Sequence, residues 1–205
     1  MTLQEIWKEL VENIKHTRAL EWVSTVSQVV SVWYARKNNV LVYPTGIIGV
    51  LIAAWLYFDS AVYADGSLNI YFFLMSVYGW YNWVQKKDET HYTYPVKWCT
   101  KSQLSVGIVF FIFSWGLLWW VLAKFTNSNT PVLDSLVSSS AITAMWWMAK
   151  RKVENWLAWI FSNIIAIPLN FYKHFYLFTL MYVLFLVLAL WGFLEWKKLA
   201  RQPNA

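Results

Sequence analysis

Two tryptophans and one asparagine, Trp156, Trp159 and Asn163, recur at helical spacing within one apolar stretch of the chain. Separations of three and seven residues put these side chains on one face of an α-helix. Tryptophan rings offer flat π surfaces, and the asparagine amide offers an acceptor and two donors. Such a face suits a flat ring that carries a hydrogen-bonding group. The alternative is structural: Trp156 would belong to an interfacial aromatic belt, and Asn163 would bond a neighbouring helix.

A second polar and aromatic face is expected in the preceding half of the chain, at Asn69, Ser76, Trp80 and Trp83. Trp83 lies at the end of its apolar segment beside Lys86, which is typical of a membrane-interface anchor. Ser76 and Trp80 lie deeper and are candidates to line a cavity. Packing is an equally open interpretation, because a chain with 16 tryptophans places some on any helical face.

Other kinds of site have no candidate residues. The single cysteine, Cys99, excludes an intramolecular disulfide and a cysteine-based zinc framework, and the histidines have no second ligand at metal spacing. P-loop, dinucleotide, nucleophile-elbow and HExxH motifs are also missing from the sequence. We therefore expect no metal, no cofactor and no enzymatic activity.

The elements that position these residues are expected to be transmembrane helices. With 59% hydrophobic and 14% charged residues, the chain could not cover a soluble surface. The net charge of +6 then reflects membrane orientation rather than nucleic-acid binding. Seven apolar segments are expected to span the bilayer: residues 20–35, 40–58, 68–85, 105–125, 131–149, 155–171 and 174–196.

Charge distribution predicts the orientation of these spans. Most Lys and Arg residues fall on the side that holds the C-terminus, so the positive-inside rule predicts a cytoplasmic C-terminus and an external N-terminus. Residues 1–19 are polar with apolar residues at helical spacing, which predicts an amphipathic interfacial helix. Residues 197–205 form the predicted cytoplasmic tail.

An internal repeat organises the predicted spans. The stretch Tyr78 to Trp83 matches Trp191 to Trp196 position by position, as aromatic-Gly-aromatic-x-x-Trp. The basic pair at 36–37 matches the pair at 151–152 if a short insertion is allowed between the copies. In that alignment Trp156, Trp159 and Asn163 replace Val40, Tyr43 and Ile47.

The repeat predicts a 3+1+3 arrangement. Residues 20–85 form one three-helix bundle, residues 86–130 a linker containing the fourth span, and residues 131–196 the second bundle. Because three helices reverse orientation, the extra span makes the two bundles parallel, with a substrate path between them.

Four further residues have two open interpretations each. Glu21 and Asp134 begin equivalent spans and could couple proton movement, or could cap a helix or pair with a nearby cation. Pro44 and Pro168 could be hinges or packing kinks.

These residues together resemble the PnuC family of bacterial vitamin transporters. The resemblance covers roughly Glu21 to Lys198 and rests on three stretches. They are the Tyr-Gly-Trp-Tyr-x-Trp motif at 78–83, the stretch at 148–156, and the Trp-x-x-Trp-x-x-x-Asn motif at 156–163. It implies a seven-helix, SWEET-like 3+1+3 fold in the bacterial inner membrane, and a homotrimer as an assembly.

The resemblance also implies facilitated diffusion of nicotinamide riboside by alternating access, with Trp156, Trp159 and Asn163 contacting the ligand. A pyridinium ring is flat and cationic, which suits stacking and cation–π attraction on tryptophan. Candidates to bind the ribose hydroxyls are Asn39, Tyr43 and Ser76. Trp80 is a further candidate to line the site. Ser76 stands where nicotinamide riboside members often carry asparagine, so thiamine and riboflavin remain alternative substrates.

Overall fold

The protein is all α-helical in a computed structural model that describes residues 3–86 and 94–202. An N-terminal helix is followed by seven helices that coincide with the seven predicted segments. The helices are α1 (Leu3–His16), α2 (Ala19–Arg36), α3 (Val42–Asp59), α4 (Tyr63–Val84), α5 (Lys101–Phe125), α6 (Pro131–Ala149), α7 (Glu154–Tyr172) and α8 (Tyr176–Leu199).

Two helices begin earlier than their apolar segments. Helix α4 starts at Tyr63 rather than at residue 68, and α5 starts at Lys101 rather than at residue 105. Their first turns are polar, so hydropathy misses them although the backbone is helical. The start of α5 is fixed by Thr100, whose hydroxyl accepts from the backbone N–H of Gln103 in a capping box.

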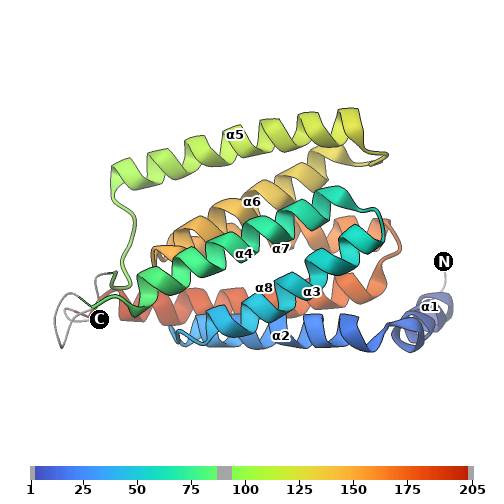
Figure 1. Ribbon diagram of the computed structural model, residues 1–205, viewed down its shortest axis with the longest axis horizontal. Helices are drawn as coiled ribbons and strands as arrows, with labels where there is room; N and C mark the ends of the chain where they lie inside the picture. The colour runs from blue at the N-terminus through green and yellow to red at the C-terminus, as the bar shows by residue number, and fades with distance from the viewer. Residues whose placement is uncertain (1–2, 87–93, 203–205) are drawn as a thin grey trace.

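The helices form two groups with one helix outside both. Helices α2, α3 and α4 pack in sequence order, as do α6, α7 and α8; the groups meet where α4 packs on α6 and where α2 packs on α8. Helix α5 packs on α6, on the side of the molecule away from α2 and α8 (Figure 1). The groups therefore share two seams, and α5 flanks only the α4–α6 seam.

The surface and interior of the fold suit a bilayer. Three helices, α3, α5 and α8, are long and apolar enough to cross a membrane. The serine-rich α6 is buried, with the hydroxyl of Ser140 donating to the Ala158 carbonyl of α7 at 2.7 Å. Helix α2, by contrast, buries Ser24 but exposes Val23 and Val26.

The backbone repeats in the register of the aromatic-Gly-aromatic motif, without an insertion. The loops that follow α2 and α6 each contain a residue in the left-handed region, Asn38 and Arg151, both at φ 51°. The loops that follow α3 and α7 contain Ala61 at φ 58° and His174 at φ 62°. Both pairs have the same sequence separation as Gly79 and Gly192.

This register corrects the sequence alignment. Tyr43, not Val40, is the counterpart of Trp156, while Gly46 and Val50 match Trp159 and Asn163. The basic pairs at 36–37 and 151–152 are therefore not equivalent positions. The two turns share a left-handed residue in the backbone, but it is asparagine in one loop and arginine in the other, so residue type did not reveal the match.

Candidate functional site

A cavity of about 710 Å³ lies between the two helix groups. Every helix except α5 contributes to its described lining. At the α1 end it is lined by exposed polar residues, including Asn13, His16 and Arg18. At the other end it stops at the buried residues Tyr43 and Trp156. The cavity therefore has a polar mouth near α1 and an aromatic floor.

One face of α7 supplies the residues that the sequence placed together. Trp156, Trp159 and Asn163 all line the cavity. Asn163 is 4% exposed, and its amide has no hydrogen-bond partner among the residues that the structure describes. The indole N–H of Trp156 is likewise buried without a partner in that part of the chain. A buried polar group without a partner costs about 1–3 kcal/mol, so a molecule that paired with these groups would stabilise this face.

Each of the two floor residues packs against a further buried tryptophan, in matching geometry. Tyr43 meets Trp83 edge to face, with ring centroids 5.1 Å apart, and its ring lies directly against the backbone of Gly79. The counterpart in the second group is Trp156 against Trp196, with centroids 5.7 Å apart.

The glycine in each aromatic-Gly-aromatic motif makes room for these rings. At Gly192 an added Cβ would stand 2.6 Å from the ring of Trp156. Gly79 stands in the same relation to Tyr43. The sequence motif marked the repeat and the family resemblance but did not show which ring approaches the glycine.

Ser76 and Tyr43 reach the cavity from the first helix group. Ser76 is buried in the lining, and its hydroxyl has no partner among the described residues. Tyr43 is fully buried there, and its hydroxyl also lacks a partner in the described chain. The helix group opposite α7 thus brings both residues to the lining, but the Tyr43 hydroxyl is enclosed by protein.

Two predicted site residues lie elsewhere. Trp80 is 40% exposed and outside the cavity lining, because the buried face of α4 runs through Ser76, Gly79 and Trp83. Asn39 is also outside the lining: its side-chain oxygen accepts from the backbone N–H of Leu41 at 2.9 Å in the turn before α3. The Asn39 side chain is therefore used in a local turn, not in the cavity.

The end of the molecule opposite α1, which we call the basic end, is tied across both seams. Trp83 donates its indole N–H to the Met148 carbonyl of α6, at 3.1 Å. Trp196 donates to the Ala35 carbonyl of α2, at 2.9 Å. The two donors are repeat counterparts, and so are the two acceptors. The interpretation of Trp83 as an interface anchor is wrong, because the ring is 1% exposed and bonded across the α4–α6 seam.

Residues 94–99 cross the basic end between α4 and α5. Lys97 exchanges backbone hydrogen bonds with the turn after α6, donating to Arg151 and accepting from Val153. The backbone N–H of Cys99 donates to Glu154 at 2.8 Å. Burial, with the nearby Glu154 carboxylate, raises the pKa of the Cys99 thiol to about 12, so this cysteine is a weak nucleophile at neutral pH.

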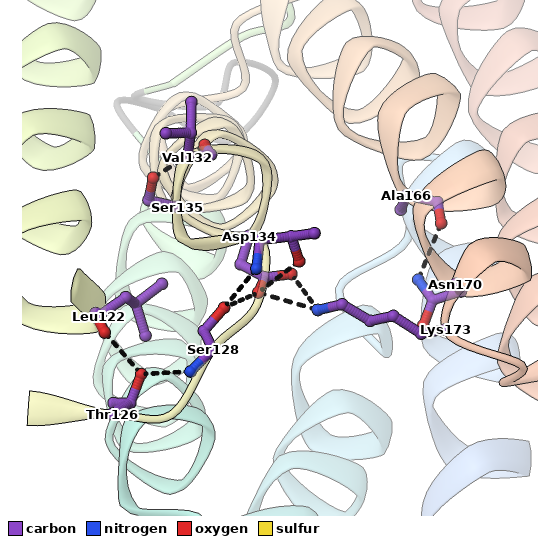
Figure 2. Close-up of polar contacts among 10 residues, drawn as sticks. Leu122, Thr126, Ser128, Val132, Asp134, Ser135, Ala166, Asn170 and Lys173 are labelled. Carbon is purple, nitrogen blue, oxygen red and sulfur yellow. Dashed lines mark hydrogen bonds and ion pairs between the residues drawn. The ribbon is translucent and has the colours of Figure 1, made fainter.

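Paired acids lie near the mouth. Asp134 accepts from the Lys173 ammonium at 2.6 and 2.8 Å and from the Ser128 hydroxyl at 2.6 Å (Figure 2). Glu21 pairs with Arg18 at 2.7 Å. Ion pairing, the structural alternative for both acids, is therefore what the structure contains.

Comparison with known proteins identifies the family. A family model described as nicotinamide mononucleotide transporter matches residues 18–198. The chain belongs to this family. The sequence-based prediction of a PnuC-like membrane transporter is thus confirmed, as is the prediction that the chain is not an enzyme.

Relatives in the nicotinamide mononucleotide transporter family include the nicotinamide riboside transporter PnuC of Escherichia coli (strain K12), 24% identical over 91% of this chain and 88% of its own. The riboflavin/roseoflavin transporter RibM of Streptomyces davaonensis is 25% identical over 63% of this chain and 62% of its own. The crystal structure of the vitamin B3 transporter PnuC superimposes with a TM-score of 0.73, covering 99% of this chain and 91% of that one at 22% identity. The two proteins share a fold.

Proposed function

We propose that the protein imports nicotinamide riboside by facilitated diffusion. The observation that carries this proposal is the buried, unpartnered amide of Asn163 beside Trp156 and Trp159 in the cavity. A nicotinamide ring supplies a flat cationic surface for the indoles and a carboxamide for the asparagine. The hydroxyls of Ser76 and Tyr43 are then proposed partners of the ribose. The names of the relatives in Escherichia coli and Neisseria mucosa point to the same ligand.

The charge of the cavity favours the riboside over the mononucleotide. Arg18 is the single Lys or Arg in the described lining, and it lies at the mouth, where Glu21 already pairs with it. Asp65 adds a carboxylate to the lining. To reach the aromatic floor, a phosphate dianion would have to lose its hydration shell, and no Lys or Arg in the described lining lies there to pair with it. Moving an unpaired charge out of water in this way costs free energy. A cationic nucleoside meets no such barrier.

Thiamine and riboflavin remain the alternative substrates. The RibM relative is named for riboflavin, although its similarity to this chain covers less of both proteins than that of the PnuC relatives. Riboflavin is uncharged and gains nothing from cation–π attraction, whereas the thiazolium of thiamine does. The cationic substrates are therefore favoured, and nicotinamide riboside also supplies the carboxamide for Asn163.

The proposal includes a transport path. We assign α2 to α8 as seven spans, with residues 20–85 and 131–196 as parallel bundles, 86–130 as the linker and 1–19 as an interfacial helix. Lys and Arg gather at the basic end, which supports a cytoplasmic C-terminus and an external N-terminus in the inner membrane. The cavity mouth then faces outward, and transport requires the Trp83 and Trp196 bonds to break. A homotrimer belongs to this proposal through the family resemblance alone.

A titration tests the substrate. Purified protein in detergent should bind nicotinamide riboside at least about tenfold more tightly than nicotinamide mononucleotide, riboflavin or thiamine, measured by isothermal titration calorimetry. Liposomes containing the protein should take up the riboside without ATP or a pH gradient. Tighter binding of riboflavin or thiamine would move the assignment to that vitamin, and preference for the mononucleotide would contradict the argument from cavity charge.

A pair of tryptophan substitutions tests the site. Trp159→Ala should weaken binding of nicotinamide riboside by about tenfold, because a stacked aromatic contact contributes on the order of 1–3 kcal/mol. Trp80→Ala makes the same change outside the cavity lining and should leave the dissociation constant within about twofold. A larger loss in Trp80→Ala than in Trp159→Ala would show that the ligand does not use this cavity.

A further inference from the structure

A small second pocket, of about 360 Å³, lies at the basic end where α2 meets α8. Its lining consists of Arg36, Lys37, Glu195, Lys198, Leu199 and Gln202. Three cations face one carboxylate, so the pocket is electropositive. It lies on the outer surface of the helix pair and is separate from the central cavity, with which it shares no residue.

Arg36 is the buried member of this pocket and is not satisfied by the protein. It is 4% exposed, and its Nε and Nη1 atoms have no hydrogen-bond partner in the described chain. The carboxylate of Glu195 stands 3.5 Å from Nε, close enough for an ion pair but not for a well-formed hydrogen bond. Buried guanidinium donors without acceptors are costly, so an acceptor from outside the chain would stabilise the arrangement.

Two tryptophans fix the guanidinium in place. The Arg36 guanidinium carbon lies 4.0 Å from the ring centroid of Trp33 and 3.7 Å from that of Trp191. Both indoles are exposed on the outer face of α2 and α8, one turn deeper than the charged residues. A charged layer at a helix end above an aromatic layer matches the headgroup and glycerol levels of a bilayer.

At the other seam, described residues of the connecting segment pack over the helix ends. There Arg151 donates to the Tyr94 carbonyl at 3.0 Å and to the Trp83 carbonyl at 3.3 Å. Residues 94–99 and α5 flank that seam. At the α2–α8 seam the protein supplies no equivalent segment among its described residues, so the pocket beside Arg36 stays open.

We infer that the α2–α8 pocket binds the phosphate of an anionic phospholipid, with Arg36, Lys37 and Lys198 as its ligands. Arginine suits a phosphate because its fork of donors can contact two oxygens, and basic pockets between membrane helices accept anionic headgroups. The lipid bridges α2 and α8 beside the Trp196–Ala35 hydrogen bond. This site lies beyond the proposed transport function and does not depend on which vitamin is carried.

Lipid titration of purified, delipidated protein tests the site. Binding of phosphatidylglycerol, phosphatidylcholine and inorganic phosphate is measured separately by native mass spectrometry and by thermal unfolding in a neutral detergent. Phosphatidylglycerol should bind and raise Tm, whereas phosphatidylcholine should not. Lys37→Gln/Lys198→Gln changes two exposed residues and should weaken phosphatidylglycerol binding by about tenfold or more without preventing folding.

A matched control removes the same charge at the same end of the molecule. Lys86→Gln/Lys101→Gln alters two exposed lysines outside the pocket lining and should bind phosphatidylglycerol as the unaltered protein does. Equal binding by both double variants would overturn the site. Protection by inorganic phosphate at the concentration where phosphatidylglycerol protects would assign the pocket to a free anion and overturn the lipid.

Discussion

Replacing Asn163 with alanine is expected to weaken binding of nicotinamide riboside by about tenfold or more while the protein remains folded. The amide is buried in the cavity lining and has no partner among the described residues, so its removal breaks no described hydrogen bond. In the complex it would pair with the carboxamide in a place that water leaves, where a lost hydrogen bond costs about 1–3 kcal/mol. Calorimetric titration measures the loss, and Tm should stay within a few degrees.

Asn170→Ala is the matched control for this prediction. Asn170 lies two turns further along the same helix, outside the cavity lining, and its amide donates to the Ala166 carbonyl at 2.8 Å (Figure 2). The substitution should leave riboside affinity within about twofold. If both variants lose affinity equally, the effect belongs to α7 as a whole. If neither does, Asn163 is not a ligand-binding residue.

Sequence patterns were sufficient where one helix determines the geometry. Trp156, Trp159 and Asn163 share a face because they share α7, and the structure places that face in the cavity. Apolar segments located α2 to α8, with bounds off by up to three residues except where a polar first turn delayed the predicted start of α4 and α5 further. Both are local properties, fixed by the helical period and by hydropathy.

Predictions failed where the answer depended on another helix or a turn. Trp80 and Trp83 are three residues apart, yet Trp80 faces outward and Trp83 bonds across the α4–α6 seam. Which of them is buried depends on how α4 is rotated against its neighbours. Asn39 bonds within its own turn, which its residue type did not reveal. The matching left-handed residues of the two loops show that the repeat needs no insertion.

The corrected register shows how two copies of one unit differ at the site. Tyr43 and Trp156 occupy equivalent places on the cavity floor, so the aromatic floor belongs to both halves. Trp159 and Asn163, in contrast, replace Gly46 and Val50. In the proposed ligand site, the polar group and the second stacking surface would therefore come from one half alone, although the two halves repeat the same backbone.

Gly192→Ala is expected to lower both Tm and riboside affinity. The added methyl group would stand 2.6–2.7 Å from three ring atoms of Trp156. That ring is 1% exposed and lies edge to face against Trp196, so it can move only toward the cavity. Overpacking of this kind costs about 1–3 kcal/mol, and a displaced Trp156 would occupy space that the proposed ligand needs. We expect a fall in Tm of several degrees and an affinity loss of about tenfold or more.

Gly116→Ala provides the same chemical change without the contact. Gly116 lies within α5, and an added Cβ there would meet nothing within 4 Å. Because alanine favours a helix over glycine by about 1 kcal/mol, this variant should be as stable as the unaltered protein or slightly more stable. Thermal unfolding and riboside titration of the two variants separate the effect of the Trp156 contact from helix propensity. A Gly192→Ala protein as stable and as tightly binding as Gly116→Ala would mean that Trp156 does not rest on Gly192, and the aromatic floor would have to be redrawn.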